Sequence, residues 1–506
     1  MKEVCCYIGL DVGTSGCKAS VVDDRGRILA SARREYSFEN PGPGRVELNP
    51  VMVWGKVKET LKEVAAAGYK PRLMSVSSIG EALVLMDRED RILQNGIIYL
   101  DERGPETMEE IREKISDRQI HRLTGIPMNF IYSLNRLLWL RRHEPRVIEK
   151  TSRYFMFGDY IIYMLTGERI IDPSTASKSM MLDAWKLDWA DEIGTLFQVP
   201  FEQFSPVAPT GTVAGRIRKK LAEELGLPVE MKVAAGCHDQ CAATLGSGGV
   251  SAGDMAAGEG STESLNLVAE KEAITEPFLE KNICFEPYVK TGQYQIPVGQ
   301  FSHGTCLRWF VREFGWDFQA KPGQESRDPA KEGKSVYDLA AETCAADAGE
   351  LFFLPYMTRS KLMEADNPAL GVFAGVDVNA SRGRMYRALL EGLCFESRKS
   401  FDILETAALP VHKIVATGGC SRSRMFMQMK ADVLEKPVSV LKNTDAGITG
   451  LAMICAVADG QYQDYKEAAA LFVKTEEELK PGKDYREKYA RYCKISRAAK
   501  ELYQNL

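Results

Sequence analysis

Residues 236–243, "GCHDQCAA", place a Cys, a His, an Asp and a second Cys within five positions. Three roles fit these residue types: a metal site, a carboxylate that takes a proton from a hydroxyl, or a helix cap between two buried thiols. Zinc requires three or four protein ligands, yet the chain has only five His and no second Cys/His cluster. The pattern therefore favours a base or a cap over a metal site.

Asp239 is the residue of this group with the clearest candidate role. A strand-like segment, Lys232 to Ala235, and Gly236 lead into a short helix that we expect to begin near Asp239. The positive end of a helix favours the ionised form of a carboxylate. At the end of a strand, in a cleft between two domains, such a carboxylate accepts the proton of an attacking hydroxyl. A simple helix cap is the alternative.

The segment "DVGTSGCK", residues 11–18, lies between two strand-like segments and not between a strand and a helix. It therefore fits neither the dinucleotide fingerprint nor the Walker loop. A hairpin turn of this composition forms a concave nest of donors for phosphate oxygens, and a nearby carboxylate can hold Mg²⁺ through water. The groups concerned are Asp11 for the metal, Gly13, Thr14, Ser15 and Gly16 for the nest, and Lys18 as a cation. A plain β-hairpin is the alternative.

A second copy of this arrangement follows residue 250. The segment "GDMAAGEGSTESLNLV" again has a strand, a Gly/Ser/Thr turn (Gly260, Ser261, Thr262) and a strand. The repetition favours phosphate binding at both turns and predicts two related halves that meet near residue 250. Further on, residues 415–434 pass from a strand through Gly418–Gly419 into an amphipathic helix. Such a turn can accept an adenine ring and ribose. Gly-Gly is also common as a simple break between a strand and a helix.

The remaining elements mix strand and helix throughout the first half. We expect an antiparallel meander of strands over 5–11, 18–23 and from 28, and a helix over 51–67 that is capped by Asn49 and followed by Gly68. Residues 320–334 are rich in Pro, Gly and charge and predict a long exposed loop.

The composition limits the classes of protein to which this chain can belong. The chain has 506 residues, of which 45% are hydrophobic and 27% charged, which is typical of a folded multidomain protein. A net charge of -5 supplies no basic field for nucleic acid or an anionic membrane. With no signal peptide or apolar span in the sequence, we expect a cytoplasmic protein. The twelve scattered Cys indicate reduced thiols and no disulfide framework.

Seven segments, in this order, resemble the FGGY family of carbohydrate kinases. They are "YIGLDVGTSGCKASVVDDRGRILA", "NRLLWLRRHEP", "GDYIIYMLTGE", "AAGCHDQCAATLGSGGV", "LFFLPYM" with "NPALGVFAGVD", "RALLEGLCFESR" and "ATGGCSRSRMFMQMKADVL". The resemblance implies an α/β fold of two actin-like, ribonuclease-H-like domains related by duplication, with ATP and sugar in the cleft between them. Residues 1–250 would carry the sugar site, the first phosphate loop and the catalytic base. Residues 251–506 would carry the second phosphate loop and the adenosine site.

The resemblance also assigns roles to individual positions. The first phosphate loop would comprise Asp11, Gly13, Thr14, Ser15 and Lys18, the second Gly260, Ser261 and Thr262, and the adenosine site Gly418, Gly419 and Ser423. Asp239 matches the catalytic base, and Gln240 a neighbour that can touch substrate. Glu81, Asp101 and Arg103 fall where several members contact substrate hydroxyls. Xylulokinases usually have Met-His where this chain has Gly80-Glu81, and glycerol kinases have Arg-Glu.

The expected function is phosphorylation of a hydroxyl of a small sugar, with ATP and Mg²⁺ as cofactors. Ketopentoses such as xylulose rank first as substrates, polyols such as glycerol or erythritol second because of Glu81, and aldonates third. The rival hypotheses are an actin-like mechanical ATPase and a non-catalytic sugar- or nucleotide-binding module. The oligomeric state stays open, with a homodimer among the possibilities.

Overall fold

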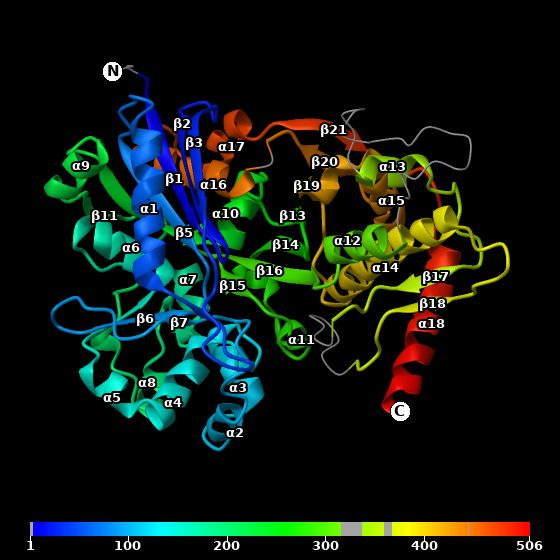
Figure 1. Ribbon diagram of the computed structural model, residues 1–506, viewed down its shortest axis with the longest axis horizontal. Helices are drawn as coiled ribbons and strands as arrows, with labels where there is room; N and C mark the ends of the chain where they lie inside the picture. Colours follow the sequence, from blue (N-terminus) through cyan, green and yellow to red (C-terminus); the bar gives the residue numbers. More distant parts are fainter. Residues whose placement is uncertain (1–3, 315–335, 359–366, 444) are drawn as a thin grey trace. The chain divides into compact units, whose positions relative to one another are not determined.

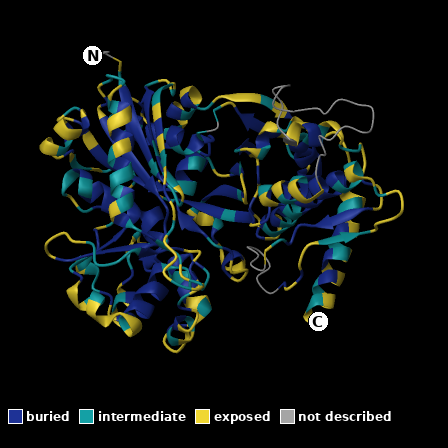
Figure 2. Cartoon of the chain, viewed as in Figure 1, coloured by how far each residue is buried: buried dark blue, intermediate teal, exposed yellow. Residues whose placement is uncertain are grey.

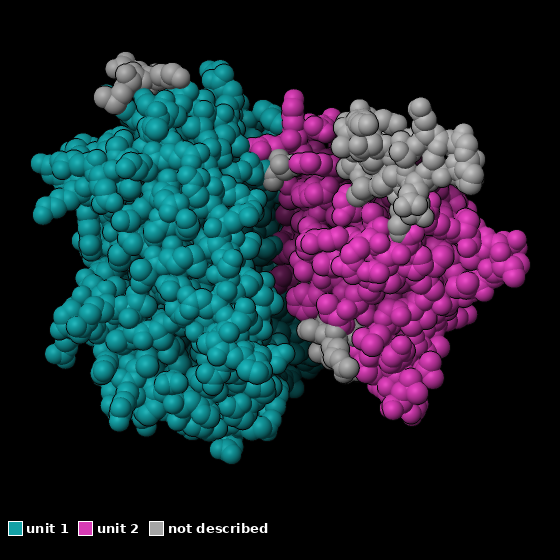
Figure 3. Space-filling model, in the orientation of Figure 1, with its two compact units in different colours: residues 1–252, 268–296, 445–474 teal, residues 253–267, 297–444, 475–506 magenta. Residues whose placement is uncertain are grey.

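The computed structural model describes residues 4–314, 336–358, 367–443 and 445–506. The loop expected over residues 320–334 lies outside these ranges. Contacts group the chain into two compact units (Figure 3): residues 1–252, 268–296 and 445–474 form unit 1, and residues 253–267, 297–444 and 475–506 form unit 2. Each unit is therefore assembled from three separate stretches of sequence. The boundary near residue 250 stays a prediction.

Unit 1 contains a six-stranded sheet in the order β11-β12-β5-β1-β2-β3 (Figure 1). Its strands are β1 (Cys6–Val12), β2 (Gly16–Asp23), β3 (Ile28–Glu35), β5 (Leu73–Ser78), β11 (Val213–Arg216) and β12 (Lys232–His238). β1, β2 and β3 form the predicted antiparallel meander, while β5 runs parallel to both β1 and β12. β1 and β5 lie inside this sheet and are buried almost throughout, including the three serines of β5 (Figure 2).

The second sheet has seven strands in the order β15-β16-β14-β13-β19-β20-β21. They are β13 (Asp254–Glu259), β14 (Glu263–Glu270), β15 (Glu286–Pro287), β16 (Gln293–Gln300), β19 (Lys413–Thr417), β20 (Val438–Leu441) and β21 (Thr475–Leu479). β13 pairs antiparallel with β14 and parallel with β19, just as β1 pairs with β2 and β5. β21 pairs antiparallel with β20, as β11 does with β12. The common order confirms the predicted duplication.

Helices and short strands complete the fold. The helices are α1 (Pro50–Ala65), α2 (Thr107–Arg112), α3 (Asp117–Thr124), α4 (Ser133–His143), α5 (Pro145–Lys150), α6 (Phe157–Thr166), α7 (Pro173–Ser177), α8 (Asp191–Phe197), α9 (Lys219–Leu225), α10 (Asp239–Gly246), α11 (Glu276–Leu279), α12 (Gly304–Phe314), α13 (Val336–Glu342), α14 (Arg382–Thr406), α15 (Arg424–Leu434), α16 (Ala446–Ala458), α17 (Tyr465–Phe472) and α18 (Arg486–Gln504). Two-stranded pairs are β4 (Glu47–Leu48) with β7 (Gly96–Ile97), β6 (Leu83–Met86) with β8 (Arg153–Met156), β9 (Leu182–Asp183) with β10 (Asp188–Trp189), and β17 (Phe352–Leu354) with β18 (Val372–Ala374). Among the described residues, 3₁₀ turns cover Phe201–Gln203, Lys271–Ala273 and Cys420–Arg422.

Two predicted helix starts are confirmed. The side chain of Asn49 accepts hydrogen bonds from the Val51 and Met52 N–H groups at the start of α1, and Pro50 is the first helical residue. α10 begins at Asp239, directly after β12. Local capping signals therefore suffice to place both helices.

Helix α10 is held against α16 through backbone contact. A Cβ atom on Gly246 would overlap the Ala446 carbonyl, and a Cβ atom on Gly450 would overlap the Ala242 carbonyl. Only glycine permits so close an approach. Around this contact Leu245 and Leu451 lie in one buried hydrophobic cluster. α16, from far downstream in the sequence, thus fixes the helix that begins with Asp239.

Two further predictions concern the state of the cysteines and the presence of membrane-spanning helices. All twelve cysteines lie among the described residues and are free thiols, as predicted. Across the part of the chain that the structure describes, we find no helix with both the length and the apolar character needed to cross a membrane.

Candidate active site

The predicted base and the predicted metal-binding carboxylate lie at one edge of the unit 1 sheet. β1 and β12 both run parallel to β5, with Asp11 opposite Ser77 and His238 opposite Ser78. Because parallel strands end at the same edge, Asp11 and the residue after His238, Asp239, come near each other. The Ser77 hydroxyl donates a hydrogen bond of 2.7 Å to Asp11 Oδ1 and orients that carboxylate.

The electrostatic environment of Asp11 reflects this proximity. Burial raises the pKa of Asp11, and the negative charge of Asp239 raises it further, to about 6. The hydrogen bond from Ser77 and the charges of Lys18 and His238 oppose the shift. A buried carboxylate that is reluctant to ionise, such as Asp11, is an oxygen ligand that a hard cation stabilises. Mg²⁺ therefore fits the residues present.

The first predicted phosphate turn is a hairpin. Asp11 lies opposite Lys18 in the β1–β2 ladder, and the Gly13 N–H donates to the Gly16 carbonyl at 3.0 Å. Between them Thr14 is half-buried and Ser15 exposed. Such a turn leaves backbone donors at its tip available to a ligand.

Lys18 has a protein partner in this structure. Its ammonium lies 2.5 Å from the carboxylate of Asp445, the residue before α16. Both side chains are partly exposed, at 25% and 34%. The cation expected to bind phosphate therefore also tethers the N-terminus of α16.

Among Cys237, His238, Asp239 and Cys241, Asp239 has the most exposed side chain. Its side chain is 27% exposed, while that of His238 is 8% exposed, with His238 Nε2 at 3.2 Å from Asp239 Oδ1. Gln240 follows in the first turn of α10 and is half-buried. One carboxylate oxygen of Asp239 is thus engaged by the imidazole.

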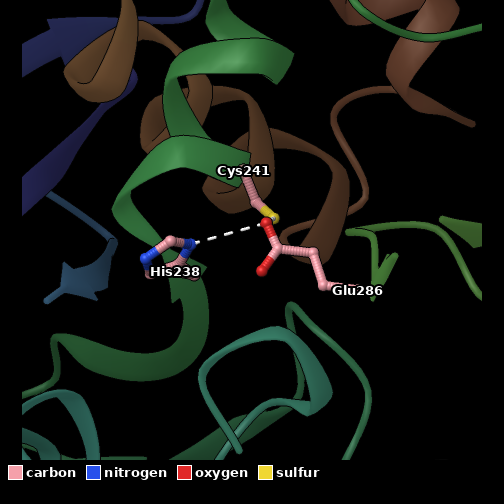
Figure 4. A group of neighbouring side chains, drawn as sticks. All are labelled: His238, Cys241 and Glu286. Carbon is pink, nitrogen blue, oxygen red and sulfur yellow. Dashed lines mark hydrogen bonds and ion pairs between the residues drawn. The ribbon is translucent and has the colours of Figure 1, made fainter. Parts of the chain in front are cut away.

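The cysteines of "GCHDQCAA" are buried and inert. Burial raises the pKa of both Cys237 and Cys241 well above that of an ordinary thiol. Ligand atoms of His238, Cys241 and Glu286 lie within 4.8 Å of one another (Figure 4). The ammonium of Lys178, however, already forms an ion pair with Glu286. A protein cation therefore balances this cluster, and Cys237 is not part of it. That these residues bind no metal stays a prediction.

The expected substrate residues separate into two groups. The buried Asp101 carboxylate accepts hydrogen bonds from the Val46 N–H and from the backbone and guanidinium of Arg103. Arg103 also pairs with Glu47 at 2.8 Å. Asp101 and Arg103 thus chiefly bind each other and the surrounding loop, and their contact with substrate stays a prediction.

Glu81 has different surroundings. It lies close enough to Tyr99, Tyr132 and Lys178 for its charge to affect their pKa values. Burial raises the pKa of Tyr99, the charges of Glu81 and Asp239 raise it further, and a hydrogen bond with Thr14 opposes the shift. The structure therefore brings Glu81 and the first phosphate turn toward the same tyrosine, which sequence reasoning did not single out.

In unit 2 the predicted second phosphate turn and adenosine turn are adjacent. Gly260 N–H donates to the Thr262 carbonyl at 3.1 Å, and the exposed Ser261 accepts a hydrogen bond from Arg308 at 2.9 Å. Gly418 has φ = +102°, and a Cβ there would lie 2.8 Å from the Glu259 carbonyl, so glycine is required. Gly419 is exposed, with open space where a Cβ would point.

Ser423 serves as a helix cap. Its side chain accepts a hydrogen bond from the Phe426 N–H at the start of α15. This accounts for the residue type, and a contact between Ser423 and adenosine stays a prediction.

A fully buried charged cluster supports the second turn, and no sequence pattern predicted it. Glu259 and Glu263 flank the turn, face each other across the ladder, and both pair with the ammonium of Lys430 from α15. His303 Nε2 lies 2.7 Å from Glu259 Oε2. Lys430 and His303 together hold the pKa of Glu259 below its ordinary value, at about 2, although burial alone would raise it.

Comparison with known proteins gives matches along the whole chain. It is 26% identical to a xylulose kinase of Bacillus subtilis, over 99% of this chain and 96% of that protein. It is 24% identical to a gluconokinase of Bacillus licheniformis, over 99% and 97% of the two chains. The crystal structure of xylulose kinase from Rhodospirillum rubrum superimposes with a TM-score of 0.86 at 26% identity, over 99% of each chain.

The two halves match two family models. Residues 6–246 match the N-terminal domain, and residues 260–458 the C-terminal domain, of the FGGY family of carbohydrate kinases. These ranges include both hairpin turns, Asp239 and the segment around Gly418. The chain therefore belongs to the FGGY family and is a carbohydrate kinase, a phosphotransferase that acts on a sugar.

Proposed function

We propose that this enzyme transfers the γ-phosphoryl group of ATP to a hydroxyl of a small sugar, with Asp239 as the base. The observation that carries the proposal is the accessible Asp239 carboxylate at the same sheet edge as Asp11 and the first hairpin turn. The sugar oxygen forms a bond to γ-phosphorus, the bond to the ADP oxygen breaks, and the hydroxyl proton passes to Asp239.

The remaining residues would bind the nucleotide. Mg²⁺, held through Asp11 and water, would neutralise charge on the phosphates. The turns at 13–16 and 260–262 would donate backbone hydrogen bonds to phosphate oxygens. Gly418 and Gly419 would lie against the adenosine, where the open space beside Gly419 supports such a contact.

We propose a ketopentose such as xylulose as the substrate. The support is the full-length similarity to xylulose kinases in sequence and structure. A second candidate is an aldonate, because gluconokinases are similar over the whole chain at nearly the same identity. Glu81 would repel an aldonate carboxylate placed beside it, which ranks xylulose first.

The test is ADP release by the purified protein with Mg·ATP and, separately, D-xylulose, D-gluconate, glycerol, erythritol or no sugar. Strong stimulation by one compound is expected. Asp239→Asn should still bind ATP but lose about a hundredfold or more of the sugar-dependent rate. Asp117→Asn is the control, because Asp117 is likewise the first residue of a helix in unit 1. ADP release that no compound stimulates, or an Asp239→Asn variant as active as Asp117→Asn, would contradict the proposal.

A further inference from the structure

Asp239 is the outermost member of a row of four charged side chains. His238 Nε2 lies 3.2 Å from Asp239 Oδ1, and His238 Nδ1 lies 3.7 Å from Glu286 Oε1. The other oxygen of Glu286 pairs with the ammonium of Lys178. Exposure falls from 27% for the Asp239 side chain to 8% for His238 and 0% for Glu286. We call Asp239, His238, Glu286 and Lys178 the charged row.

Several elements fix the inner members of the charged row. Glu286 lies in β15, and its Oε1 accepts a hydrogen bond of 2.6 Å from Gln295 of β16. Lys178 is the residue that follows α7. The backbone N–H of His238, at the end of β12, donates to Ser174 of α7 at 2.9 Å. Figure 4 shows the imidazole directed at the Glu286 carboxylate. Neither Glu286 nor Lys178 can therefore relax toward solvent.

The imidazole of His238 lies between two carboxylates, and this determines where its protons are. A neutral imidazole has one N–H and one lone pair, so one of the two carboxylates would face a lone pair. A proton on each nitrogen places a positive imidazolium between the two carboxylates, with Nδ1 in ion-pair contact with Glu286 at 3.7 Å and not hydrogen-bonded to it. Burial and the nearby charge of Lys178 would lower the pKa of His238, but Asp239 and Glu286 outweigh them and hold that pKa above the ordinary value.

Lys178 supplies the charge balance that keeps Glu286 ionised. Burial alone would raise the pKa of Glu286, yet Lys178 and His238 lower it to about 2. A buried carboxylate without such partners would take up a proton and could no longer attract the imidazole. Lys178 thus acts on His238 through Glu286.

The absence of a side chain at Gly80 leaves room for the side chain of Lys178. A Cβ atom at position 80 would overlap the side chain of Lys178 and come within 3.4 Å of the His238 ring. Any larger residue, such as the Met that the resemblance leads us to expect in xylulokinases, would displace Lys178. Gly80 and Lys178 are therefore matched to each other in this chain.

We propose that Glu286 and Lys178 are positioning residues for phosphoryl transfer. Lys178 keeps Glu286 charged, Glu286 holds His238 with a proton on both nitrogens, and His238 binds Asp239 Oδ1 so that the second oxygen of Asp239 faces the substrate hydroxyl. This inference rests on the proposed role of Asp239 as the base. A purely structural ion pair would affect folding but not the proton of His238 or the turnover of the folded enzyme.

The first variant is Glu286→Gln, which keeps the shape of the side chain and removes its charge. Its matched control is Glu391→Gln, because Glu391 is an equally buried glutamate of unit 2 that pairs with Arg387 and Lys488. With D-xylulose and Mg·ATP, we expect kcat of Glu286→Gln to fall by about tenfold to a hundredfold while KM for Mg·ATP stays unchanged. The control should keep the wild-type kcat.

The second measurement follows the proton directly. The chain has five His, so ¹⁵N spectra of histidine-labelled full-length protein resolve each ring, and His238→Gln assigns the signal. The titration midpoint of His238 should move to lower pH in Glu286→Gln and stay in place in Glu391→Gln. The other ionisable groups that face His238 are Asp239 of α10, Lys178 beside α7, Asp11 of β1 and Asp172 before α7, and none of them is altered.

Gly80→Ala keeps the inference testable if Glu286→Gln folds poorly. It leaves every charge in place but displaces Lys178 from Glu286, so kcat should fall, with thermal denaturation confirming a folded protein. An unchanged His238 midpoint in Glu286→Gln would overturn the inference, as would wild-type kcat in either folded variant. If no sugar stimulates the wild-type enzyme, the proposed function fails, whereas the ¹⁵N measurement still decides whether the charged row exists.

Discussion

Asp11 of β1 and Asp239, the residue directly after β12, lie at the ends of the two strands that flank β5, and the charge of Asp239 adds to the burial that raises the pKa of Asp11 to about 6. The ordinary value is 3.8. Between these values the folded protein holds a proton that the unfolded chain releases, so the free energy of unfolding falls as pH rises through this window. Above about pH 6, the ionised Asp11 carboxylate lowers the free energy of unfolding by the full amount, about 2–3 kcal/mol.

Asp11→Asn should therefore stabilise the metal-free protein at pH 8 and have little effect at pH 4. The measurement is urea denaturation in EDTA at both pH values. The same variant should lose most sugar-dependent ADP release, since the carboxylate proposed for Mg²⁺ is gone. A variant that is less stable at pH 8 than the wild type would contradict the assigned environment of Asp11.

Lys430→Met should destabilise unit 2 severely. The substitution leaves Glu259 and Glu263 buried together without their cation, which costs about 3–5 kcal/mol. The depressed pKa of Glu259 has its own consequence in the wild type: its stabilising contribution is complete above the ordinary value of 4.5 and is lost as pH falls toward 2.

Chemical denaturation of the full chain, followed by fluorescence, measures both effects. Lys436→Met serves as the control, because Lys436 lies just after the same helix and is not buried. Equal stability of Lys430→Met and Lys436→Met would exclude the supporting role of the buried cluster.

Gly450→Ala should separate α10 from α16. The added Cβ meets the Ala242 carbonyl in a packed core, which typically costs about 1–3 kcal/mol. Because α10 begins with Asp239, kcat should fall as well. Gly447→Ala, on the same helix with no atom within 4 Å of the new Cβ, should be neutral or stabilising by up to about 1 kcal/mol. Thermal melting and ADP release by both variants test the contact.

Lys18→Met should raise KM for Mg·ATP and leave KM for the sugar unchanged, if Lys18 binds phosphate. Asp445→Asn removes the charge that pairs with Lys18 in this structure and leaves Lys18 itself in place, so it should affect KM for Mg·ATP far less. Steady-state kinetics of the two variants distinguish the roles. Identical effects would mean that Lys18 acts through the N-terminus of α16 and not on the nucleotide.

Local elements of this fold were predictable because their signals are local. Asn49 and Pro50 predict the start of α1, the Gly/Ser/Thr turns at 13–16 and 260–262 predict two hairpins, and the change from a strand pattern to Asp239 predicts α10. Each depends on backbone conformations that only a few residue types adopt readily.

The buried charged residues that hold these elements in place were not predictable. Glu286 and Lys178 meet His238 only through tertiary structure, and nothing in "CFEPYV" or "STASKSM" marks them. Lys430 resembles any lysine of an amphipathic helix, yet it is fully buried. Pairing of buried charges is decided by packing between distant segments, and a single sequence carries no record of it.

The three-segment composition of unit 1 has a consequence for how the enzyme is made. A ribosome that has synthesised the predicted first half, up to residue 250, has completed the strand and helix that carry Asp239. It has not yet made Glu286 or α16. Until residue 458 has left the exit tunnel, Gly246 has no helix to pack against, and apolar surface around Leu245 stays exposed. Between the synthesis of Asp239 and that of Ala458 the nascent chain therefore lacks the packing that fixes α10, and its exposed apolar surface is prone to aggregation.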